Sequence, residues 1–292
     1  MINDKKICAI VQARQGSSRL PGKALIDICG KPALQRVIER LREAKLLDDV
    51  IVATTENEAN NAIIELCEQL NCSYFRGSEN DVLDRVLNAA RKFEVDIIVE
   101  ITADCLFCDW DIVDSLIKHY TGTDVDYCSN VIERTFPRGF DCQVFGIKTL
   151  ERVNKEVDND LDRQHVSSWI YLNPKSKGKY TIASITAPPE LNRPDLEITL
   201  DTPEDLDLIR WLFEYGKEYR IDMTCLDVIN AIDTYPYVYN KVKDIARKDY
   251  FSELKEAYES QGGAKDEKVE CSSDRSRRAR SNGRPAKRRK SK

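Results

Sequence analysis

The first half of the chain alternates between short apolar runs and longer stretches in which apolar residues recur every three or four positions. The short runs predict strands buried on both faces, at residues 7–11, 50–53, 72–75 and 96–101. The periodic stretches predict amphipathic helices, over residues 34–41, 59–70, 82–87 and 112–117. This repeated order predicts an α/β fold with a mostly parallel sheet and helices on its faces.

The second half is less regular. Its predicted strands lie at residues 126–129, 142–147, 180–186 and 197–200. Its predicted helices lie at residues 149–157, at residues 162–172 and from Thr202 onward. Thr202 is a good N-cap, Pro203 suits the first helical position, and the acidic Glu204 and Asp205 favour a helix N-terminus.

Several polar segments follow predicted strands of the first half, namely residues 13–23, Thr54-Thr55, Arg76-Gly77 and Asp104. In open α/β sheets, ligands bind beyond the carboxyl ends of the strands. We therefore expect these segments to line one edge of the sheet.

The longest of these segments contains glycines and three cations, Arg14, Arg19 and Lys23. A basic, glycine-containing loop between a strand and a helix is a common way to hold a polyphosphate, because backbone N–H groups point at the phosphate oxygens. The loop is neither a P-loop nor the G-x-G-x-x-G of dinucleotide-binding folds. By spacing alone, an ordinary solvated turn remains the alternative.

Two aspartates, Asp104 and Asp201, each end a predicted strand. Mg²⁺ is usually held by one or two carboxylates together with waters and substrate phosphate oxygens. Beside a phosphate-binding loop, the pair would supply the metal site of a nucleotidyl transfer. The alternative is that each aspartate only caps the turn or helix that follows it.

The composition, 41% hydrophobic and 33% charged over 292 residues, is typical of a soluble globular protein. No apolar run reaches the roughly 20 residues of a membrane span, and no signal-peptide pattern is visible before the first predicted strand. The ten cysteines are therefore expected to be reduced thiols of a cytoplasmic protein without membrane contact. Cys105 and Cys108 form a C-x-x-C, but without a second pair of ligands a metal–thiolate site is disfavoured.

The charge is unevenly distributed along the chain. Residues 274–292 carry ten cations and one acid, a net charge of +9, whereas the whole chain carries −5 and the remainder therefore −14. An acidic body argues against nucleic-acid binding except through this tail. Apolar residues almost vanish after about residue 262, which predicts a folded unit over residues 1–261 and a disordered basic tail over 262–292.

Five blocks occur in order along the chain: Ile10 to Arg14 with Arg19 to Lys23, Arg76 to Glu79 with Asp81 to Leu83 and Arg85, Pro137 to Asp141 with Val144-Phe145, Asp162 to Val166, and Leu200 to Leu206. Together they resemble the cytidylyltransferase family that contains the acylneuraminate and CMP-Kdo synthetases, and they are most similar to the branch typified by spore-coat polysaccharide biosynthesis protein F. The resemblance covers about residues 7–215. It departs after Asp104, where two prolines usual in the family are missing, so a looser turn is expected there.

The resemblance implies a Rossmann-like fold of the nucleotide-diphospho-sugar transferase type and a role for each matched position. CTP would be bound by Ala13, Arg14, Gly16, Ser17, Arg19 and Lys23, with Thr54 and Arg76 near its base and ribose. Mg²⁺ would be held by Asp104 and Asp201, and the acceptor would be faced by Arg138, Asp141 and His165. An insertion at about residues 130–195 would add acceptor contacts and the contacts of a homodimer.

The expected reaction is a Mg²⁺-dependent transfer of CMP from CTP to a nonulosonate-like sugar acid, or to a related acceptor such as a phosphonate, with release of pyrophosphate. It would serve the synthesis of a surface polysaccharide or glycan. Lys23, Arg14 and Arg19 would stabilise the leaving pyrophosphate. His165 is a candidate general base, although a lone histidine is more often a structural hydrogen-bonding group.

Two alternatives belong to other classes of protein. A glycosyltransferase that uses a nucleotide sugar would place two acids in a D-x-D after a strand, but Asp124-Val125-Asp126 precedes a predicted strand. A non-catalytic nucleotide-binding protein would rely on its basic tail, although such tails carry little specificity.

Overall fold

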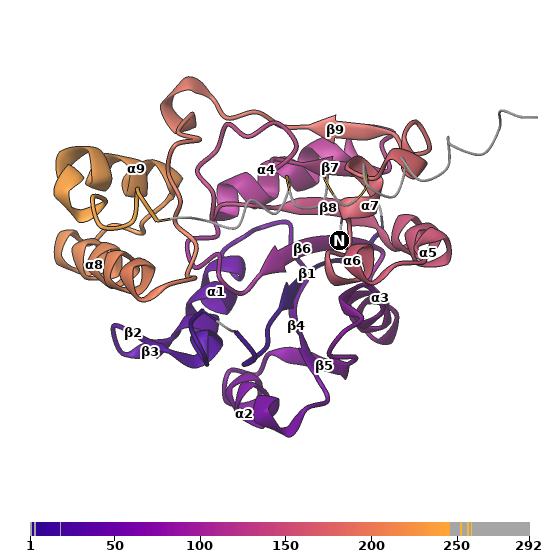
Figure 1. Ribbon diagram of the computed structural model, residues 1–292, viewed down its shortest axis with the longest axis horizontal. Coiled ribbons are helices and arrows are strands. Elements are labelled where there is room, and N and C mark those ends of the chain that lie inside the picture. The colour runs from indigo at the N-terminus through magenta and orange to yellow at the C-terminus, as the bar shows by residue number, and fades with distance from the viewer. Residues whose placement is uncertain are drawn as a thin grey trace, which may run out of the picture.

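The computed structural model describes residues 2, 4–17, 19–245, 252, 256 and 258 (Figure 1). Its centre is a seven-stranded sheet in the order β5-β4-β1-β6-β8-β7-β9. The strands are β1 Ile7–Gln12, β4 Asp49–Thr55, β5 Ser73–Gly77, β6 Ile97–Thr102, β7 Tyr127–Ser129, β8 Gln143–Gly146 and β9 Ile182–Ser184. A separate hairpin consists of β2 Asp27–Ile28 and β3 Lys31–Pro32.

The strands of the first half pair in parallel: β1 lies between β4 and β6, and β4 also pairs with β5. β8 runs antiparallel to β6 and β7, and β9 is parallel to β7 at the edge of the sheet. The predicted α/β fold with a mostly parallel sheet is therefore confirmed. The predicted insertion at residues 130–195 contributes β8 and β9 to the same sheet, and its part in a dimer stays a prediction.

Helices cover both faces of the sheet (Figure 1). They are α1 Ala33–Leu41, α2 Asn61–Gln69, α3 Val82–Lys92, α4 Trp110–Thr121, α5 Ile147–Glu156, α6 Asp160–Gln164, α7 Ser168–Tyr171, α8 Pro203–Tyr219 and α9 Cys225–Thr234. The four helices predicted in the first half correspond to α1 to α4, and the one predicted from Thr202 is α8. α9 lies outside the predicted helices.

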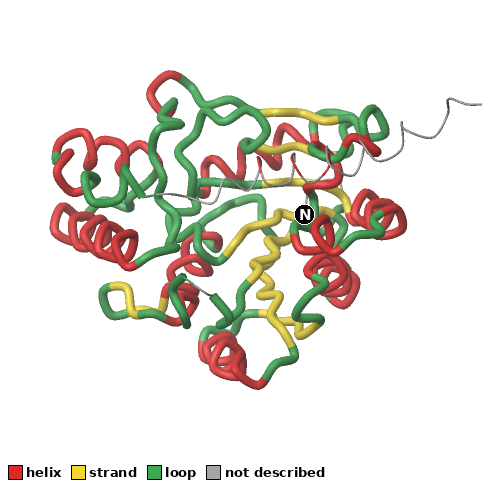
Figure 2. The backbone as a smooth tube through the Cα atoms, in the orientation of Figure 1, coloured by secondary structure: helices red, strands yellow, loops and turns green. Residues whose placement is uncertain are grey.

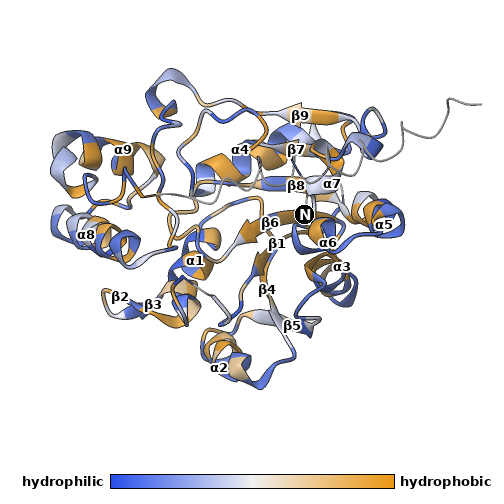
Figure 3. Cartoon of the chain, in the orientation of Figure 1, coloured by the Kyte–Doolittle hydropathy of each residue, from blue (hydrophilic) through white to orange (hydrophobic). Residues whose placement is uncertain are grey.

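Two apolar layers enclose the sheet, because successive side chains of a strand point to opposite faces. Val11 and Val99 belong to the layer that contains residues of α1, α2, α4, α8 and α9. Ile10 and Ile98 belong to the layer that contains residues of α3, α5 and α7. Figure 3 shows the hydrophobic residues concentrated in the central strands β1 and β6, as expected for strands buried on both faces.

The predicted strand at residues 197–200 is wrong. Ile198 is buried, as the alternation indicates, but the segment is loop outside the sheet (Figure 2). It pairs instead with another loop, where Ile198 N donates to Arg138 O at 2.7 Å. Gly139 has a φ of +108°, and a Cβ there would lie 2.9 Å from the backbone of Ile198, so the two loops approach this closely only with glycine. The alternation of apolar and polar residues therefore reflects burial of one side of the segment, and not pairing with a neighbouring strand.

The predicted helix over residues 162–172 is interrupted. It forms two short helices, α6 and α7, because Val166 adopts a φ of +51° between them. A β-branched residue in this conformation is strained, and Val166 is fully buried in the layer that contains α3 residues. His165 consequently lies at a bend rather than within a helix.

The nine cysteines within the described ranges are all free thiols. Over the same residues, no three His, Cys, Asp or Glu side chains gather in a way that could hold a metal ion, and Cys108 Sγ donates instead to Cys105 O at 2.8 Å. None of the helices described has the length and hydrophobicity needed to cross a membrane. The predicted disordered tail at residues 262–292 lies outside the described residues.

Candidate active site

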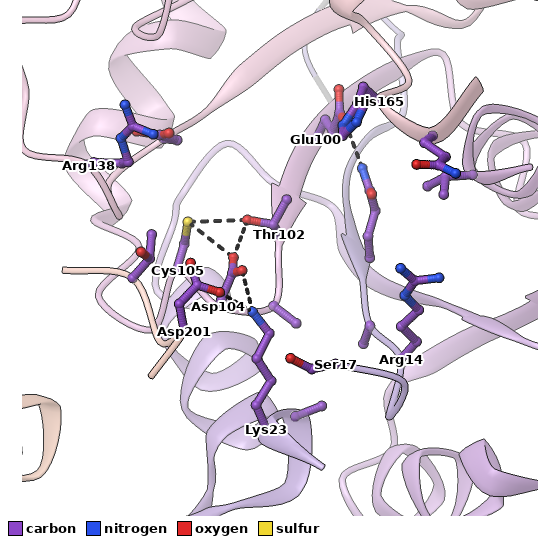
Figure 4. Close-up of a pocket in the computed structure, with 18 of the residues that line it drawn as sticks. Arg14, Ser17, Lys23, Glu100, Thr102, Asp104, Cys105, Arg138, His165 and Asp201 are labelled. Atoms are coloured by element: carbon purple, nitrogen blue, oxygen red, sulfur yellow. Dashed lines mark hydrogen bonds and ion pairs between the residues drawn. The ribbon is translucent and has the colours of Figure 1, made fainter. Parts of the chain in front are cut away.

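A cavity of about 550 Å³ opens at the carboxyl ends of β1 and β6 (Figure 4). Its lining comes from segments far apart in the sequence: the loop after β1, part of α3, the end of β6, and residues 131–143, 164–171 and 197–201. This is the edge at which open α/β sheets bind their ligands.

The floor of the cavity continues one apolar face of the sheet. Ile10 and Ile98 contribute to the layer that contains α3 residues. Two positions further along each strand, on the same face, Gln12 and Glu100 line the cavity. The site therefore begins where the apolar layer ends.

Lys23 joins the two predicted metal-binding aspartates. Its Nζ donates to Asp104 Oδ2 at 2.7 Å and to Asp201 Oδ1 at 2.9 Å (Figure 4). Burial alone would lower the pKa of Lys23, but the two carboxylates outweigh burial and raise it. Burial would likewise raise the pKa of Asp104, but Lys23 and a hydrogen bond from Thr102 lower it. Lys23 and Asp104 are therefore both charged at neutral pH. Arg19 Nη2 adds a second cation 3.1 Å from Asp201 Oδ1.

Neither aspartate is a helix cap. The N-cap of α4 is Asp109, and the N-cap of α8 is Thr202 in a capping box with Asp205. Asp104 and Asp201 therefore line the cavity without capping either helix, which argues against the simple capping interpretation.

The loops that carry the two aspartates are tied together, since Leu200 N donates to Asp104 O at 3.0 Å. The turn after Asp104 is closed by backbone hydrogen bonds from Cys105 to Thr102 at 3.1 Å and from Cys108 to Cys105 at 3.3 Å. The missing prolines therefore do not leave the looser turn that the sequence suggests.

The other residues of the predicted phosphate loop also line the cavity, namely Ala13, Arg14, Gly16 and Ser17. Arg14 Nη1 lies 3.3 Å from Glu79 Oε1, and each of these side chains is more than a third exposed. An exposed ion pair of this kind contributes little stability, so Arg14 is readily available to an anionic ligand.

Two residues predicted near the nucleotide do not line the cavity. Thr54 is fully buried within β4. Arg76 donates to the backbone carbonyls of Thr55 and Glu56 at 3.2 and 2.8 Å, which holds the chain after β4 in place. Their role near the base and ribose stays a prediction.

The side of the cavity assigned to the acceptor carries paired charges. Arg138 Nε lies 3.2 Å from Glu197 Oε2, and Arg134 forms a bidentate ion pair with Asp141. Burial would lower the pKa of Arg134, but Asp141 outweighs it and raises the pKa. With His165, all three predicted acceptor residues line the same cavity as the phosphate loop.

The candidate D-x-D of a glycosyltransferase lies elsewhere. Asp126, just before β7, accepts hydrogen bonds from Thr181 and pairs with Arg152 at 2.9 Å. Asp124 is exposed, and neither aspartate lines the cavity. These contacts give Asp126 a structural role.

The predicted set lacks several cavity residues, and three charged ones among them are Arg85, Glu100 and Arg134. Arg85 is 2% exposed and donates to Ser78 O at 2.5 Å, while its Nε has no hydrogen-bond partner within the described part of the chain. Burial, and then the charge of Arg14, lowers the pKa of Arg85 to about 10.

A sequence signal existed for two of the three. Arg85 is a cation among the apolar positions of a predicted helix, and Glu100 is an acid inside a strand predicted to be buried on both faces. A charge at a position that the pattern assigns to the core is often functional. Arg134 lies in a loop, and the sequence offers no comparable signal.

A cationic loop after the first strand of a parallel sheet, facing two carboxylates at the same edge, is typical of an α/β protein that binds a phosphate-containing ligand. Residues 8–255 match the sequence model that describes cytidylyltransferases. The chain belongs to the cytidylyltransferase family and is therefore a nucleotidyltransferase, as its five blocks indicate.

Two relatives and one solved structure match this chain over nearly their whole length. The chain is 34% identical to the uncharacterized protein MJ1063 of Methanocaldococcus jannaschii, over 84% of this chain and 98% of that protein. It is 29% identical to the spore coat polysaccharide biosynthesis protein SpsF of Bacillus subtilis, over 79% and 95%. A solved cytidylyltransferase structure from Leptospira borgpetersenii superimposes with a TM-score of 0.75 at 28% identity, over 83% of this chain and 99% of that one.

Proposed function

We propose that the protein transfers CMP from CTP to a sugar acid, with Mg²⁺, and releases pyrophosphate. The observation that carries this proposal is the convergence of Asp104 and Asp201 on one cationic nitrogen, beside a loop with two further cations. Phosphate oxygens need cations and backbone N–H groups, and a transferred phosphoryl group needs its charge neutralised.

The residues of the nucleotide side fit CTP and Mg²⁺. Arg14, Arg19 and Lys23 would bind the triphosphate. Asp104 and Asp201 would hold the metal, because one carboxylate oxygen of each faces the same point, where Lys23 Nζ lies at 2.7 and 2.9 Å from them. When bound, Mg²⁺ supplies charge neutralisation of the triphosphate.

The acceptor would occupy the side lined by Arg138, Asp141 and His165. A cavity of about 550 Å³ is large enough for a nucleotide and a small acid together. Arg134 and Arg138 favour an anionic acceptor, and the polysaccharide biosynthesis named for the Bacillus subtilis relative favours a sugar destined for a surface glycan.

In the reaction, an acceptor oxygen forms a bond to the α-phosphorus while the bond from that phosphorus to the bridging oxygen of pyrophosphate breaks. The electron pair leaves with pyrophosphate, whose charge Lys23, Arg14 and Arg19 stabilise. The acceptor proton passes to a base, for which His165 is the candidate. Positioning and charge neutralisation supply most of the rate.

The setting proposed for this reaction is the cytoplasm, in a homodimer. Nine free cysteines fit a reducing compartment. The dimer rests on the family resemblance, and sedimentation of the purified full chain tests it.

The experiment is pyrophosphate release by the full chain with Mg²⁺, each of the four ribonucleoside triphosphates and a panel of 3-deoxy-2-keto sugar acids. Release is expected with CTP only, and only in the presence of an acceptor. If the chain binds CTP but does not release pyrophosphate with any of the acceptors, this result would argue against transfer. Release of free nucleotide from a nucleotide sugar would favour glycosyl transfer instead.

A further inference from the structure

Glu100 is a carboxyl group without an evident structural purpose. It lies in the middle of β6, is 4% exposed, and faces the cavity from the sheet. Ile98, the preceding residue on the same face, is apolar and packs in the core. A purely structural position at this depth would take an apolar side chain as well, because burying a carboxyl without full pairing is unfavourable.

The hydrogen bonds of Glu100 are half made. Its Oε1 accepts from Gln12 Nε2 at 2.7 Å, while its Oε2 is buried and has no partner among the described residues. Ser167 also faces this carboxyl group and favours its charged form, although the Ser167 hydroxyl donates to Gln143 Oε1 at 2.7 Å. Glu100 Oε2 is therefore left without a hydrogen-bond donor among the described residues.

The surroundings of Glu100 are polar, and none of the groups found to shift its pKa is a cation. Burial raises the pKa to about 7, against the opposing effects of Ser167 and Gln12. Tyr127 and Tyr171 are the titratable groups that sense its charge from β7 and α7, together with Cys142 beside β8. Tyr127 also donates to Gln143 Oε1 at 2.5 Å, so the amide oxygen of Gln143 is fully used.

Glu100 lies beside His165, one of the residues proposed to face the acceptor. Figure 4 shows Glu100 and His165 at one end, away from the group formed by Lys23, Asp104 and Asp201. A carboxylate would repel a phosphate, so the triphosphate of CTP is not its partner. An acceptor that lies between the α-phosphorus and His165 would pass over Glu100.

We propose that Glu100 is a specificity-determining residue of the acceptor site, whose Oε2 receives a hydrogen bond from a hydroxyl or amino group of the sugar acid. This proposal rests on the proposed function. Acceptors that lack the donor would be rejected, because they would leave the buried oxygen unpaired in the complex. Glu100 takes no part in bond making.

The test uses the full chain carrying Glu100→Gln, which keeps the shape of the side chain and an oxygen for Gln12. The matched control is Glu151→Gln, the same chemical change on α5, in an ion pair with Arg91 of α3 whose two side chains are each more than a third exposed. Thermal shift is measured with 3-deoxy-manno-octulosonate and N-acetylneuraminate, each with and without CTP and Mg²⁺. Steady-state pyrophosphate release follows with each acid that binds.

The expected result is that at least one acid stabilises the wild type and the control but not Glu100→Gln. The KM for that acid should rise roughly tenfold or more in Glu100→Gln, because a hydrogen bond to a carboxyl group is lost, while the KM for CTP stays within about twofold. Rescue of the KM by Glu100→Asp would further support a carboxyl requirement.

Three results would overturn the proposal: equal stabilisation of wild type and Glu100→Gln by the acids, no stabilisation of either, or a rise confined to the KM for CTP. The proposed function fails separately. If an acid stabilises the wild type selectively but no pyrophosphate is released, Glu100 binds the acid and the transfer reaction is wrong.

Discussion

Lys23 holds together two carboxylates that lie 81 and 178 residues further along the chain. Two neighbouring carboxylates repel each other, and the Lys23 ammonium between them offsets that repulsion. The same ammonium is the group proposed to bind the triphosphate. In the proposed complex, Lys23 would exchange carboxylate partners for phosphate oxygens, and the metal would lie between the carboxylates in its place.

At the residue scale, Glu100→Gln is expected to stabilise the protein above neutral pH. Burial raises the pKa of the Glu100 carboxyl from 4.5 to about 7. The folded state therefore binds this proton more tightly than the unfolded state does, and stability falls as pH rises through that interval. The glutamine of the variant does not ionise, so the variant does not lose stability in this way.

The stability gain of Glu100→Gln over the wild type should be about 2 kcal/mol larger at about pH 8 than at about pH 5.5, from the linkage of one proton. Urea unfolding of both proteins at the two pH values measures it, and other titrating groups cancel in the difference. A gain that does not change with pH would contradict a raised pKa at this position.

At the scale of elements, loops and helix caps position the two aspartates of the proposed metal site. Asp201 directly precedes the capping box of α8, and its backbone N donates to Asp205 Oδ2 at 3.1 Å. α9 begins with the same kind of capping box, from Thr224 to Asp227, and neither residue lines the cavity. The two caps make a matched pair of tests.

Thr202→Ala and Thr224→Ala should each lower the free energy of unfolding by about 1 kcal/mol, since each removes an N-cap oxygen. Only Thr202→Ala should also reduce kcat, because only that cap positions an active-site carboxylate. Urea unfolding and pyrophosphate release measure the two effects. Equal loss of activity in both variants would show that the stability of the whole fold, and not the geometry of Asp201, determines the activity.

The same scale shows where pattern reasoning succeeds. The strands and helices of the first half are predicted within a few residues, because each buries an apolar face of regular period. The prediction of a strand at residues 197–200 is wrong because alternation shows only that one side of a segment is buried. A strand also needs a neighbouring strand, and this segment pairs with the loop at Arg138 instead. The pattern does not predict the bend at Val166, because tertiary packing imposes its φ of +51°.

At the scale of the whole molecule, the site combines segments from residue 12 to residue 201. Arg14, Lys23 and Asp104 are predictable because the carboxyl ends of the parallel strands β1 and β6 meet at one edge, whereas Asp201 reaches the cavity from a loop and not from the strand predicted before it. Arg134 is not predictable, because only the folded loop brings it to Asp141. Thr54 and Arg76 follow the strand-end rule by sequence, yet they lie within the sheet and against backbone carbonyls.

Removal of residues 263–292 should leave kcat/KM within about twofold of the full chain, since the segment has too few apolar residues to build part of a site. The match to cytidylyltransferases also ends at residue 255. Pyrophosphate release by the full and shortened chains measures this. A large loss of turnover in the shortened chain would give the basic tail a catalytic role.

The central claim is that Asp104 and Asp201 form the metal site of CMP transfer, and Asp104→Asn tests it most directly. Pyrophosphate release from CTP is measured over a Mg²⁺ titration for the wild type, for Asp104→Asn and for the control Asp207→Asn, an exposed position on α8. We predict a loss of kcat/KM of roughly 100-fold or more in Asp104→Asn, because a charge that stabilises the transition state through the metal is removed. The control should match the wild type. Full activity of Asp104→Asn at every Mg²⁺ concentration would contradict the account.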